Sequence, residues 1–492
     1  MTEIRGRGDR LDPALLRLIA VLLMGGLMGL LDGTIVNVGI GTLGDHFDSS
    51  LGTVGWVATG YLLAVTLAIP FTGWAVDRFG SRRMWLTGLA LFVVGSLASG
   101  LAWNVESLIA FRVVQGFGGG MLDPIMLTLL ARVAGPERVG RVMGLMGIVI
   151  PLGPVLGPIL GGLIIEGLDW RWMFLVNIPI GVLAFALSLR VVPADLPKSE
   201  RTAAPLDVLG LALLGPAFAV LTFALSRAGE DSGFGAAPVI VALALGALLL
   251  IGYGVHAVRV GSRALIGLGL FRSRGFSASV AVMGLTGVML FSMLFLVPLY
   301  QQEVRGHGVL AAGLLLAPLG VGSFLAMPVA GRLSDKVGAR RLAPLGALVI
   351  ALGSLVHVRA GVSTSEVLLG ACAFTTGVGL GLIGAPTMGS LYRTLPGESV
   401  AQGTSVLYIV NQLGASLGIA VVALLLQRQA DGGHAAVESF QAASWWVFGA
   451  AVAVLVAGGF LPGKQETAAA GAKGGSAGSV SPPVSAGPAR TP

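Results

Sequence analysis

The chain has 492 residues, of which 55% are hydrophobic and only 11% are charged. Soluble domains carry about 25% charged residues, because a water-facing surface has to be covered with them. The composition therefore excludes an assembly of soluble domains and indicates a protein with many membrane-spanning segments. The net charge of +7 fits basic loops beside a membrane better than a nucleic-acid surface. The single cysteine, Cys372, excludes an internal disulfide and a cysteine-based metal cluster.

Apolar runs long enough to span a bilayer recur along the whole chain. Continuous runs of this length are helices, because a helix satisfies its backbone polar groups internally and barrel strands are shorter and alternate in polarity. We predict fourteen spans, at residues 18–41, 52–76, 84–102, 107–131, 142–165, 172–191, 208–225, 239–258, 277–300, 309–330, 342–358, 367–391, 404–426 and 445–461. The predicted fold class is an all-α integral membrane protein.

The basic residues orient the chain in the membrane. With the N-terminus inside, 25 of the 31 Lys and Arg fall in the N-terminal segment, the even-numbered loops and the tail. Basic loops favour the cytoplasmic side, so both termini are predicted to be cytoplasmic. We expect residues 1–17 to form a cytoplasmic N-terminal segment. Residues 462–492, rich in Ala, Gly, Ser and Pro, are expected to form a disordered cytoplasmic tail.

A repeated motif divides the membrane part of the chain. The segment Gly73-Trp-Ala-Val-Asp77-Arg78-Phe-Gly80-Ser-Arg82-Arg83 recurs 258 residues later as Gly331-Arg-Leu-Ser-Asp335-Lys336-Val-Gly338-Ala-Arg340-Arg341. Both copies are predicted to be cytoplasmic loops, so the repeat is parallel. The copies are eight helices apart. This spacing predicts an N-terminal six-helix half at 18–191, a linker with two additional helices at 192–276 and a C-terminal six-helix half at 277–461.

Further motifs follow in the first half. They are Leu31-Asp32-Gly-Thr34-Ile-Val-Asn37, Trp56-Val-Ala-Thr-Gly-Tyr61, Arg112-Val-Val-Gln115-Gly116, Gly153-Pro-Val-Leu-Gly157-Pro158-Ile-Leu-Gly161-Gly162 and Trp170-Arg171-Trp172-Met-Phe174-Leu-Val-Asn177-Ile-Pro179-Ile-Gly181. Together with the repeated motif, and in this order, they resemble the major facilitator superfamily and, within it, the 14-spanner drug/proton antiporter family. One departure is Gly39-Ile-Gly41, where the family has Ala-Leu-Pro at the end of its first helix.

Glycines four residues apart form a smooth strip on which another helix packs closely, and the prolines bend the segment. The resemblance implies that Gly153, Gly157, Pro158, Gly161 and Gly162 also make a tight seal between the halves that prevents leak. It further implies that the two repeated loops form a charge network that latches the cytoplasmic face and opens during transport. Orientation alone explains the basic residues of these loops but not Asp77 and Asp335.

Three ionisable residues lie within the predicted spans, away from their ends: Asp32, Arg112 and Asp123. Such residues are costly in a bilayer unless they are paired or hydrated. Asp32 and Arg112 are both predicted to lie in the outer half of the membrane, so they can pair. A static ion pair and a proton-coupling pair both fit this depth, and the family resemblance favours proton coupling.

Asp123 follows Arg112 by eleven residues, which places both on one face of a helix, with Gln115 close to the same line. If that face lines a central cavity, Asp123 and Gln115 contact the substrate. The alternative, that Asp123 is a structural residue hydrogen-bonded near Pro124, stays open. In the second half we assign Asn411 and Gln412 to the cavity, although such side chains also bridge helices.

The predicted function is a proton-coupled secondary transporter that exports amphipathic drugs or antibiotics as a multi-pass protein of the plasma membrane. The alternative is a dedicated exporter or importer of one endogenous metabolite. We expect no enzyme activity, no cofactor and no metal. The sequence has no phosphate-binding loop, which argues against ATP as the energy source, and the resemblance implies the proton gradient instead. The expected partners are the lipid bilayer, protons and a small amphipathic, cationic substrate, with no nucleic acid, and a monomer is expected to suffice.

Overall fold

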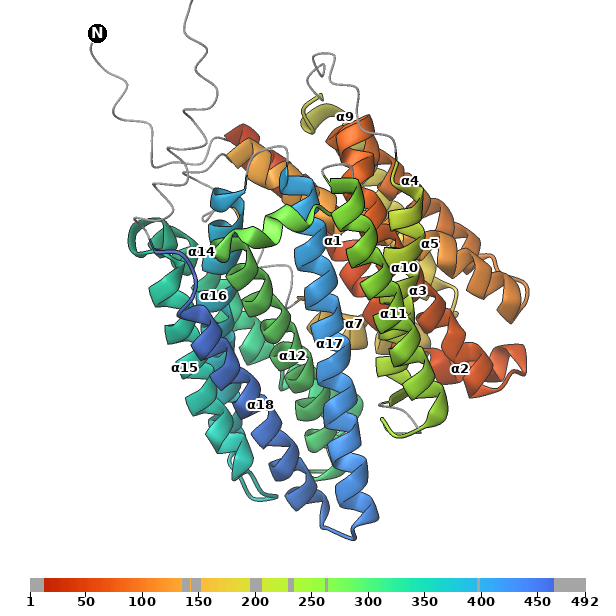
Figure 1. Ribbon diagram of the computed structural model, residues 1–492. Coiled ribbons are helices and arrows are strands. Elements are labelled where there is room, and N and C mark those ends of the chain that lie inside the picture. The colour runs from red at the N-terminus through yellow and green to blue at the C-terminus, as the bar shows by residue number, and fades with distance from the viewer. Residues whose placement is uncertain are drawn as a thin grey trace, which may run out of the picture.

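The computed structural model describes residues 13–134, 142, 152–194, 206–228, 234–261, 264–395 and 399–463. Within these ranges the chain is helical and contains no strand (Figure 1). The helices are α1 Pro13–Val38, α2 Ile40–Phe47, α3 Leu51–Phe79, α4 Ser81–Gly100, α5 Val105–Ala134, α7 Leu152–Gly167, α8 Trp172–Leu175, α9 Asn177–Val191, α10 Val208–Arg227, α11 Ala237–Val260, η3 Leu268–Arg272, α12 Arg274–Glu303, α13 Val309–Leu314, α14 Ala317–Val337, α15 Ala339–Val358, α16 Glu366–Thr394, α17 Val400–Asp431 and α18 Ala436–Gly458. We call α1 to α9 the first repeat and α12 to α18 the second repeat.

The predicted all-α membrane fold is confirmed. In the described part of the chain, 13 helices are long and apolar enough to cross a membrane, and each overlaps one of the predicted spans. The remaining predicted span, 142–165, lies partly outside the described residues, and its described part is the 16-residue helix α7. The total of fourteen, the side of the termini and the division at 18–191, 192–276 and 277–461 stay predictions.

The prediction that the two copies of the repeated motif are loops is wrong, because most of each copy is helical. α3 continues to Phe79 and α14 continues to Val337, and a single glycine separates each from the next helix. Long charged side chains let a helix extend beyond the apolar layer while their charges reach water. The turns require glycine, because Gly80 has φ 96° and Gly338 has φ 90°, a region that residues with a Cβ rarely adopt.

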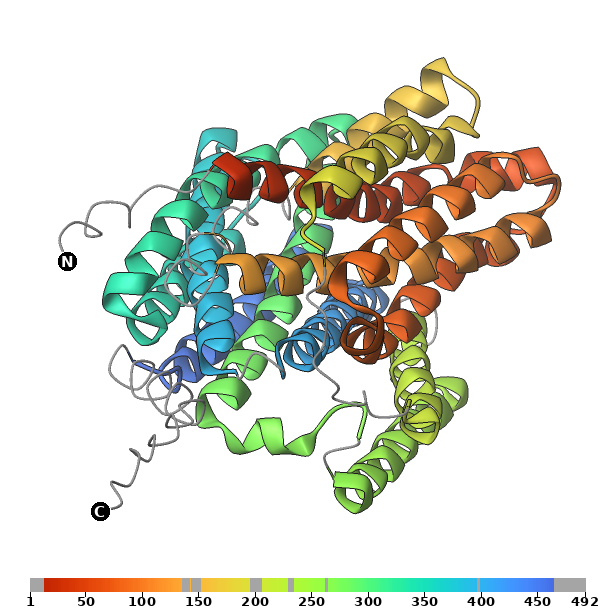
Figure 2. The same ribbon diagram turned by 90° about the horizontal axis from the view of Figure 1, so that it is seen from above.

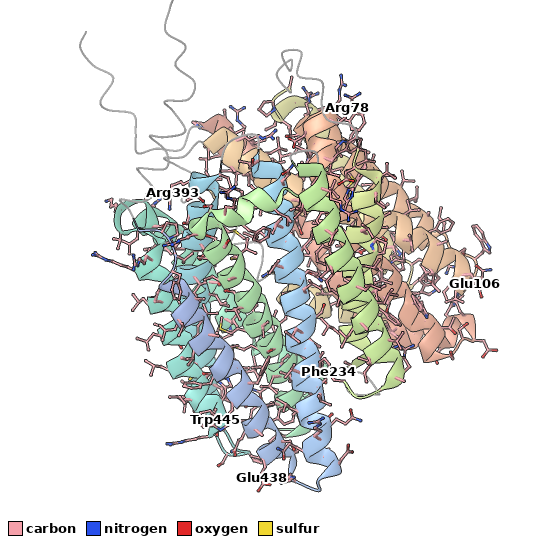
Figure 3. The ribbon with its side chains drawn as sticks, in the orientation of Figure 1. Arg78, Glu106, Phe234, Arg393, Glu438 and Trp445 are labelled. Carbon is pink, nitrogen blue, oxygen red and sulfur yellow. The ribbon has the colours of Figure 1, made fainter. Side chains whose placement is uncertain are left out.

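Five labelled residues mark the two ends of the bundle. Arg78 and Arg393 lie at one end, whereas Glu106, Phe234 and Glu438 lie at the opposite end (Figure 3). Following the predicted orientation, we call the first end cytoplasmic and the second end outer.

The apolar core joins the two repeats at the cytoplasmic end. One buried cluster there includes Leu18 and Leu130 of the first repeat together with Phe276 and Leu391 of the second. Toward the outer end the buried residues of the first repeat, such as Ile35, form a cluster of their own, and a third cluster extends along the second repeat. The repeats therefore share their core mainly at the cytoplasmic end, and α7 packs against α13 between their outer parts.

The helices α10 and α11 pack against each other, and α10 also contacts α3 and α17. Seen from above, this pair lies at the edge of the bundle where the two repeats meet, in yellow-green (Figure 2). Its contact with α3 is close: a Cβ on Gly215 would collide with the side chain of Leu67, and Trp56 stacks on Phe223 with ring centroids 6.1 Å apart.

Candidate functional site

A buried polar cluster surrounds Asp32 of α1. Arg112 of α5 donates a hydrogen bond from Nη1 to Asp32 Oδ2, so the structure brings together the two residues expected to pair. The side chains of Asp32 and Arg112 are 0% and 1% exposed. Such a pair tolerates burial only because each charge offsets the other, and removing one partner would leave an isolated charge in a dry interior.

Arg112 is held in place by further contacts. Its Nε donates to the carbonyl of Val57 at 3.2 Å, and its guanidinium carbon lies 3.9 Å from the centroid of the Tyr61 ring. The ring of Phe174 lies on it as well, at 5.6 Å. Aromatic faces attract a cation, so these contacts stabilise the charge of the buried Arg112 side chain.

Two carboxamides complete the cluster around Asp32. Gln115 donates from Nε2 to Asp32 Oδ1 at 2.8 Å, and Asn177 of α9 donates from Nδ2 to the same oxygen at 2.9 Å. Both amides also donate to Ser96 Oγ of α4, at 3.0 and 3.1 Å. The Asp32 carboxylate thus joins α1 to α5 and α9, and Ser96 of α4 is bonded to both amides.

Sequence reasoning missed Asn177, Ser96 and Tyr61 as members of this cluster. Asn177 and Tyr61 lie within quoted motifs, and a carboxamide in an otherwise apolar span was the available signal for Asn177. Ser96 offered no signal, because single serines are common in membrane helices and most bond within their own helix.

Gln115 does not belong to the cavity to which we had assigned it. Its side chain is fully buried, and its amide is occupied by Asp32 and Ser96. The reason is that α1 lies along this face of α5 and covers it at the level of Asp32. The face predicted for Arg112 and Asp123 is therefore a helix interface at one level and a cavity wall at the other.

The cavity lies between the two repeats. It encloses about 1260 Å³, counting its opening to solvent, and its walls come from α1, α5, α12, α14, α16 and α17. The lining is mostly apolar and includes four methionines: Met126, Met283, Met327 and Met388. Its mostly apolar lining with a few polar groups is typical of a site for a small amphipathic molecule.

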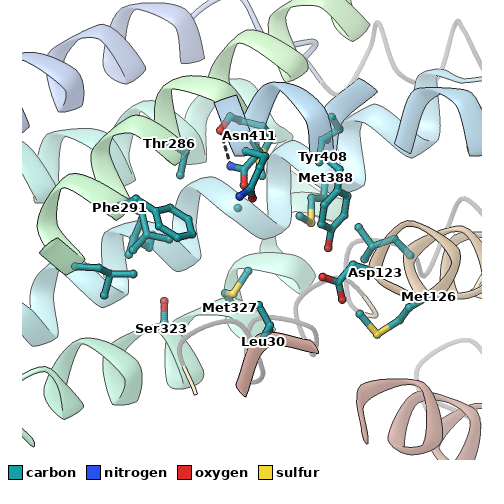
Figure 4. A pocket seen from close by; sticks show the side chains of 18 of the residues that line it. Leu30, Asp123, Met126, Thr286, Phe291, Ser323, Met327, Met388, Tyr408 and Asn411 are labelled. Carbon is teal, nitrogen blue, oxygen red and sulfur yellow. Dashed lines mark hydrogen bonds between the residues drawn. The ribbon is translucent and has the colours of Figure 1, made fainter. Parts of the chain in front are cut away.

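Asp123 lines this cavity (Figure 4). In the described part of the chain its carboxylate has no hydrogen bond or ion pair. Figure 4 shows the Tyr408 side chain of the facing repeat pointing toward it. Gly26 of α1 lies alongside, since a Cβ there would be 3.3 Å from Asp123 Oδ1. The nearby Pro124 carbonyl accepts from Thr128 Oγ1 at 2.7 Å, whereas the Asp123 carboxylate faces the open space.

Asn411 and Gln412 line the same cavity from α17. Asn411 Nδ2 also donates to the carbonyl of Met283 at 2.9 Å, so it bridges α17 and α12. The structure therefore brings three of the four residues assigned to a substrate cavity to one cavity, on opposite repeats.

Each copy of the repeated motif is held by an arginine that sequence reasoning did not single out. Asp77 pairs with Arg132 of α5 at 3.4 Å, and Asp335 pairs with Arg393 of α16 at 2.6 Å. The signal that could have found them was a lone arginine at the cytoplasmic end of corresponding helices. We call these two contacts the Asp–Arg latches.

The other members of the repeated motif have different surroundings. Arg82 donates to the Leu189 carbonyl at the end of α9. The remaining basic residues of the motif are exposed: Arg78, Arg83, Lys336, Arg340 and Arg341. Gly73 and Gly331 are buried inside α3 and α14.

The glycine-rich helix α7 packs mainly on α1. A Cβ on Gly157 would collide with Thr34, whose hydroxyl is already bonded to the carbonyls of Leu30 and Leu31. Gly161 is buried, and Gly162 has open space beside it. Gly153 and Pro158 belong to α7, and their surroundings lie outside the described part of the structure.

Comparison with known proteins agrees with this fold. The family model "Major Facilitator Superfamily" matches residues 22–419. The multidrug resistance protein B homolog of Mycobacterium tuberculosis is 37% identical over 427 residues, covering 86% of this chain and 78% of that protein. The lincomycin resistance protein LmrB of Listeria monocytogenes is 30% identical and covers 85% of this chain and 88% of its own length. The multidrug export protein EmrB of Escherichia coli is also 30% identical, covering 83% of this chain and 79% of that protein.

The solved structure of the proton:xylose symporter XylE superimposes with a TM-score of 0.66 at 16% identity, covering 92% of this chain and 98% of that chain. The chain therefore belongs to the major facilitator superfamily, a family of transporters. Its relatives named above are drug-efflux members, so the family predicted from the motifs is confirmed, and the protein is a multi-span protein of the plasma membrane.

The contact between Gly157 and Thr34 predicts a position-specific effect of added volume. Gly157→Ala should lower the stability of the protein by about 1–3 kcal/mol, because the new Cβ forces α7 away from α1. Gly162→Ala is the matched control, since no atom lies within 4 Å of its added Cβ. Thermal unfolding of the purified proteins in detergent, followed by tryptophan fluorescence, measures the difference. Equal melting temperatures for the two variants would contradict this packing.

Proposed function

We propose that the protein is a proton-coupled secondary transporter that exports amphipathic cationic compounds, such as drugs or antibiotics, across the plasma membrane. This proposal rests on the different surroundings of two carboxylates within the predicted spans. Asp32 is enclosed in a polar cluster with Arg112, whereas Asp123 faces a cavity without a bonded partner in the described part of the chain. An antiporter exchanges a proton for a substrate, and two separate carboxylates allow one group for each.

The cavity supports a substrate that is apolar over most of its surface. Its wall is largely hydrocarbon, and four methionines contribute flexible, polarisable side chains that adapt to ligands of different shape. This favours a broad range of substrates over one metabolite. The names of the relatives, which include multidrug export and antibiotic resistance proteins, point in the same direction.

Asp123 supports a positive charge on the substrate. A carboxylate at this depth in a membrane is costly unless it is paired, hydrated or neutralised. A substrate amine or quaternary ammonium supplies the missing countercharge, while the apolar body of the substrate occupies the methionine-rich wall. Because one chain forms the whole cavity, a monomer suffices for binding.

Asp32 and Arg112 are proposed as the proton-coupling pair, with the proton gradient as the energy source and no cofactor. A proton arriving from outside neutralises Asp32 and removes its electrostatic attraction to Arg112. Loss of the attraction loosens α1 from α5 within the first repeat and thereby favours the opposite orientation of the cavity. The shared apolar core at the cytoplasmic end supports an outward-facing state, in which substrate leaves and the proton enters.

The two Asp–Arg latches are proposed to control the rate of this change. They lie at the cytoplasmic end, away from the cavity, and are repeated in both halves of the molecule. Paired charges at the ends of neighbouring helices stabilise one arrangement and have to separate for the other.

The proton-coupling role predicts the behaviour of Asp32→Asn. Purified protein in proteoliposomes, with ethidium as the cationic probe, should lose uphill transport under an imposed pH gradient but retain downhill movement of ethidium. Asparagine still accepts a hydrogen bond from Arg112 but cannot take up a proton in this range. Asp45→Asn, which changes an exposed carboxylate, is the control. Undiminished uphill transport in Asp32→Asn would remove this residue from the mechanism.

The cavity carboxylate predicts a loss that depends on substrate charge. Asp123→Asn should weaken ethidium binding about tenfold, the effect of losing one charge-assisted contact, while binding of the neutral probe chloramphenicol changes little. Asp123→Glu, which keeps the charge, should retain most of the ethidium affinity. Equilibrium binding to purified protein gives both affinities. An equal loss for the charged and the neutral probe would argue for a structural role of Asp123.

The latches predict an effect on rate that is independent of the substrate. Asp77→Asn should slow ethidium and chloramphenicol transport by a similar factor and leave both affinities unchanged. Arg132→Gln breaks the same contact, so the double variant should be no slower than either single one. Transport rates in proteoliposomes test this. Additive losses, or a loss confined to one probe, would contradict a shared latch.

A further inference from the structure

Asn177 lies in the sixth predicted span, at the junction of α8 and α9. α8 ends at Leu175, Val176 follows, and Asn177 is the first residue of α9. Its side chain is 2% exposed and reaches into the first repeat, where Nδ2 contacts Asp32 Oδ1 and Ser96 Oγ. Proton coupling through Asp32 and Arg112 by itself does not require a polar residue at this junction.

We propose that Asn177 is a positioning residue that transmits the protonation state of Asp32 to α8 and the outer face of the first repeat. This inference rests on the proposed function, in which Asp32 takes up the proton. It assigns Asn177 no contact with the transported substrate.

The chemistry of the carboxamide suits this role. A charged carboxylate only accepts hydrogen bonds, whereas a protonated one also carries an O–H that needs an acceptor. Arg112 has no acceptor to offer. Gln115 Oε1 already accepts from Arg112 Nη1 at 2.9 Å and from Ser99 Oγ at 3.5 Å. Asn177 Oδ1 accepts no hydrogen bond in the described part of the chain, so it is the carboxamide oxygen open to a new donor.

Protonation of Asp32 therefore has a defined consequence. The proton binds Asp32 Oδ1, and the hydrogen bond from Asn177 Nδ2 to that oxygen breaks. The Asn177 amide rotates so that its Oδ1 accepts the new O–H, while Gln115 keeps its hydrogen bond to Ser96. The side chain that begins α9 changes its orientation with each proton that enters or leaves.

α8 connects this change to the outer face, because Val176 between α8 and α9 keeps helical φ and ψ of −60° and −27°. The carbonyl of Phe174 accepts a hydrogen bond from Ser96 Oγ at 2.9 Å, so α8 is bonded to the same hydroxyl as Asn177. The neighbouring Met173 packs on Gly39, where α1 turns into α2, so tightly that a Cβ on Gly39 would collide with it. A rotation at Asn177 is thereby transmitted to the outer ends of α1 and α2.

The other charged and titratable groups around Asp32 are few. α5 contributes Arg112 and α3 contributes Tyr61, whose ring lies under the guanidinium. The contacts described from α4, α8 and α9 come from Ser96, Phe174 and Asn177, which do not titrate.

The test follows α8 directly and needs no substrate. Trp172 lies on α8 and is 45% exposed, so Trp172→Cys in a Cys372→Ser background serves as the reporter. Its labelling by a membrane-impermeant maleimide is measured in right-side-out vesicles over a series of external pH values. The same reporter with Asp32→Asn gives the intrinsic pH dependence of thiol labelling. The labelling rate of each variant is divided by the rate of this reference at the same pH.

We expect the normalised labelling rate to change by about tenfold with external pH when Asp32 and Asn177 are both present, the effect of one hydrogen bond to a charged group. Asn177→Leu should abolish this change and reproduce the Asp32→Asn curve. Ser99→Ala is the matched control, because Ser99 contacts Gln115 but not Asp32, and it should keep the change. A pH response that persists in Asn177→Leu overturns the proposal.

A second variant covers the case in which Asn177→Leu does not fold, as judged by size-exclusion chromatography. Asn177→Asp keeps the shape but replaces the N–H donor by a second carboxylate, which should move the response to higher pH because two like charges favour a shared proton. An unchanged response in Asn177→Asp overturns the proposal. A reporter that alone already matches Asp32→Asn also overturns the proposal for Asn177, whereas the role of Asp32 in proton coupling is decided separately by the uphill-transport assay of Asp32→Asn.

Discussion

The pairing of Asp32 with Arg112 in a dry interior is the interaction on which the first repeat depends. Neither charge is stable alone in a medium without water, so each requires the other and both require neighbours that satisfy their remaining hydrogen bonds. Gln115 of α5 and Asn177 of α9 donate to Asp32, and Ser96 of α4 accepts from both of these amides. A group that binds a proton in such surroundings changes the balance of several helices at once.

Close approach of the helix backbones makes this cluster possible. A Cβ on Gly95 of α4 would lie 2.6 Å from Gln115 Cα, and a Cβ on Gly116 would collide with the carbonyl of Tyr61. Small residues in α4 and α5 therefore bring Ser96 and the motif of α3 within hydrogen-bonding and ring-contact distance of Arg112. In a bilayer such packing also supplies association energy that the hydrophobic effect does not.

The two repeats have the same turn and latch at the cytoplasmic end but differ in the carboxylates within their predicted spans. Both have a glycine turn at the cytoplasmic end and an Asp–Arg latch beside it, formed by Asp77 with Arg132 and by Asp335 with Arg393. Only the first repeat has carboxylates within its predicted spans. The second repeat contributes neutral side chains such as Asn411 and much of the methionine-rich wall. This division is consistent with proton chemistry in one half and adaptable substrate contacts shared by both.

The sequence by itself determined the helices, their parallel repeat and the pairing of Asp32 with Arg112, because hydrophobic length, motif spacing and depth along a helix are local properties of the chain. The same local reasoning predicted a loop at the motif that contains Asp77 and placed Gln115 in the cavity. Both assignments were wrong. Tertiary structure alone decided which helix covers which face: Asn177 reaches Asp32 across 145 residues, and Arg132 reaches Asp77 across 55. Asp123 and Gln115 sit on one helix with opposite outcomes, because α1 covers the face of α5 at Gln115, whereas Asp123 faces the cavity beside Gly26. Such contacts depend on how side chains of distant helices fit together, which no periodicity within a single helix encodes.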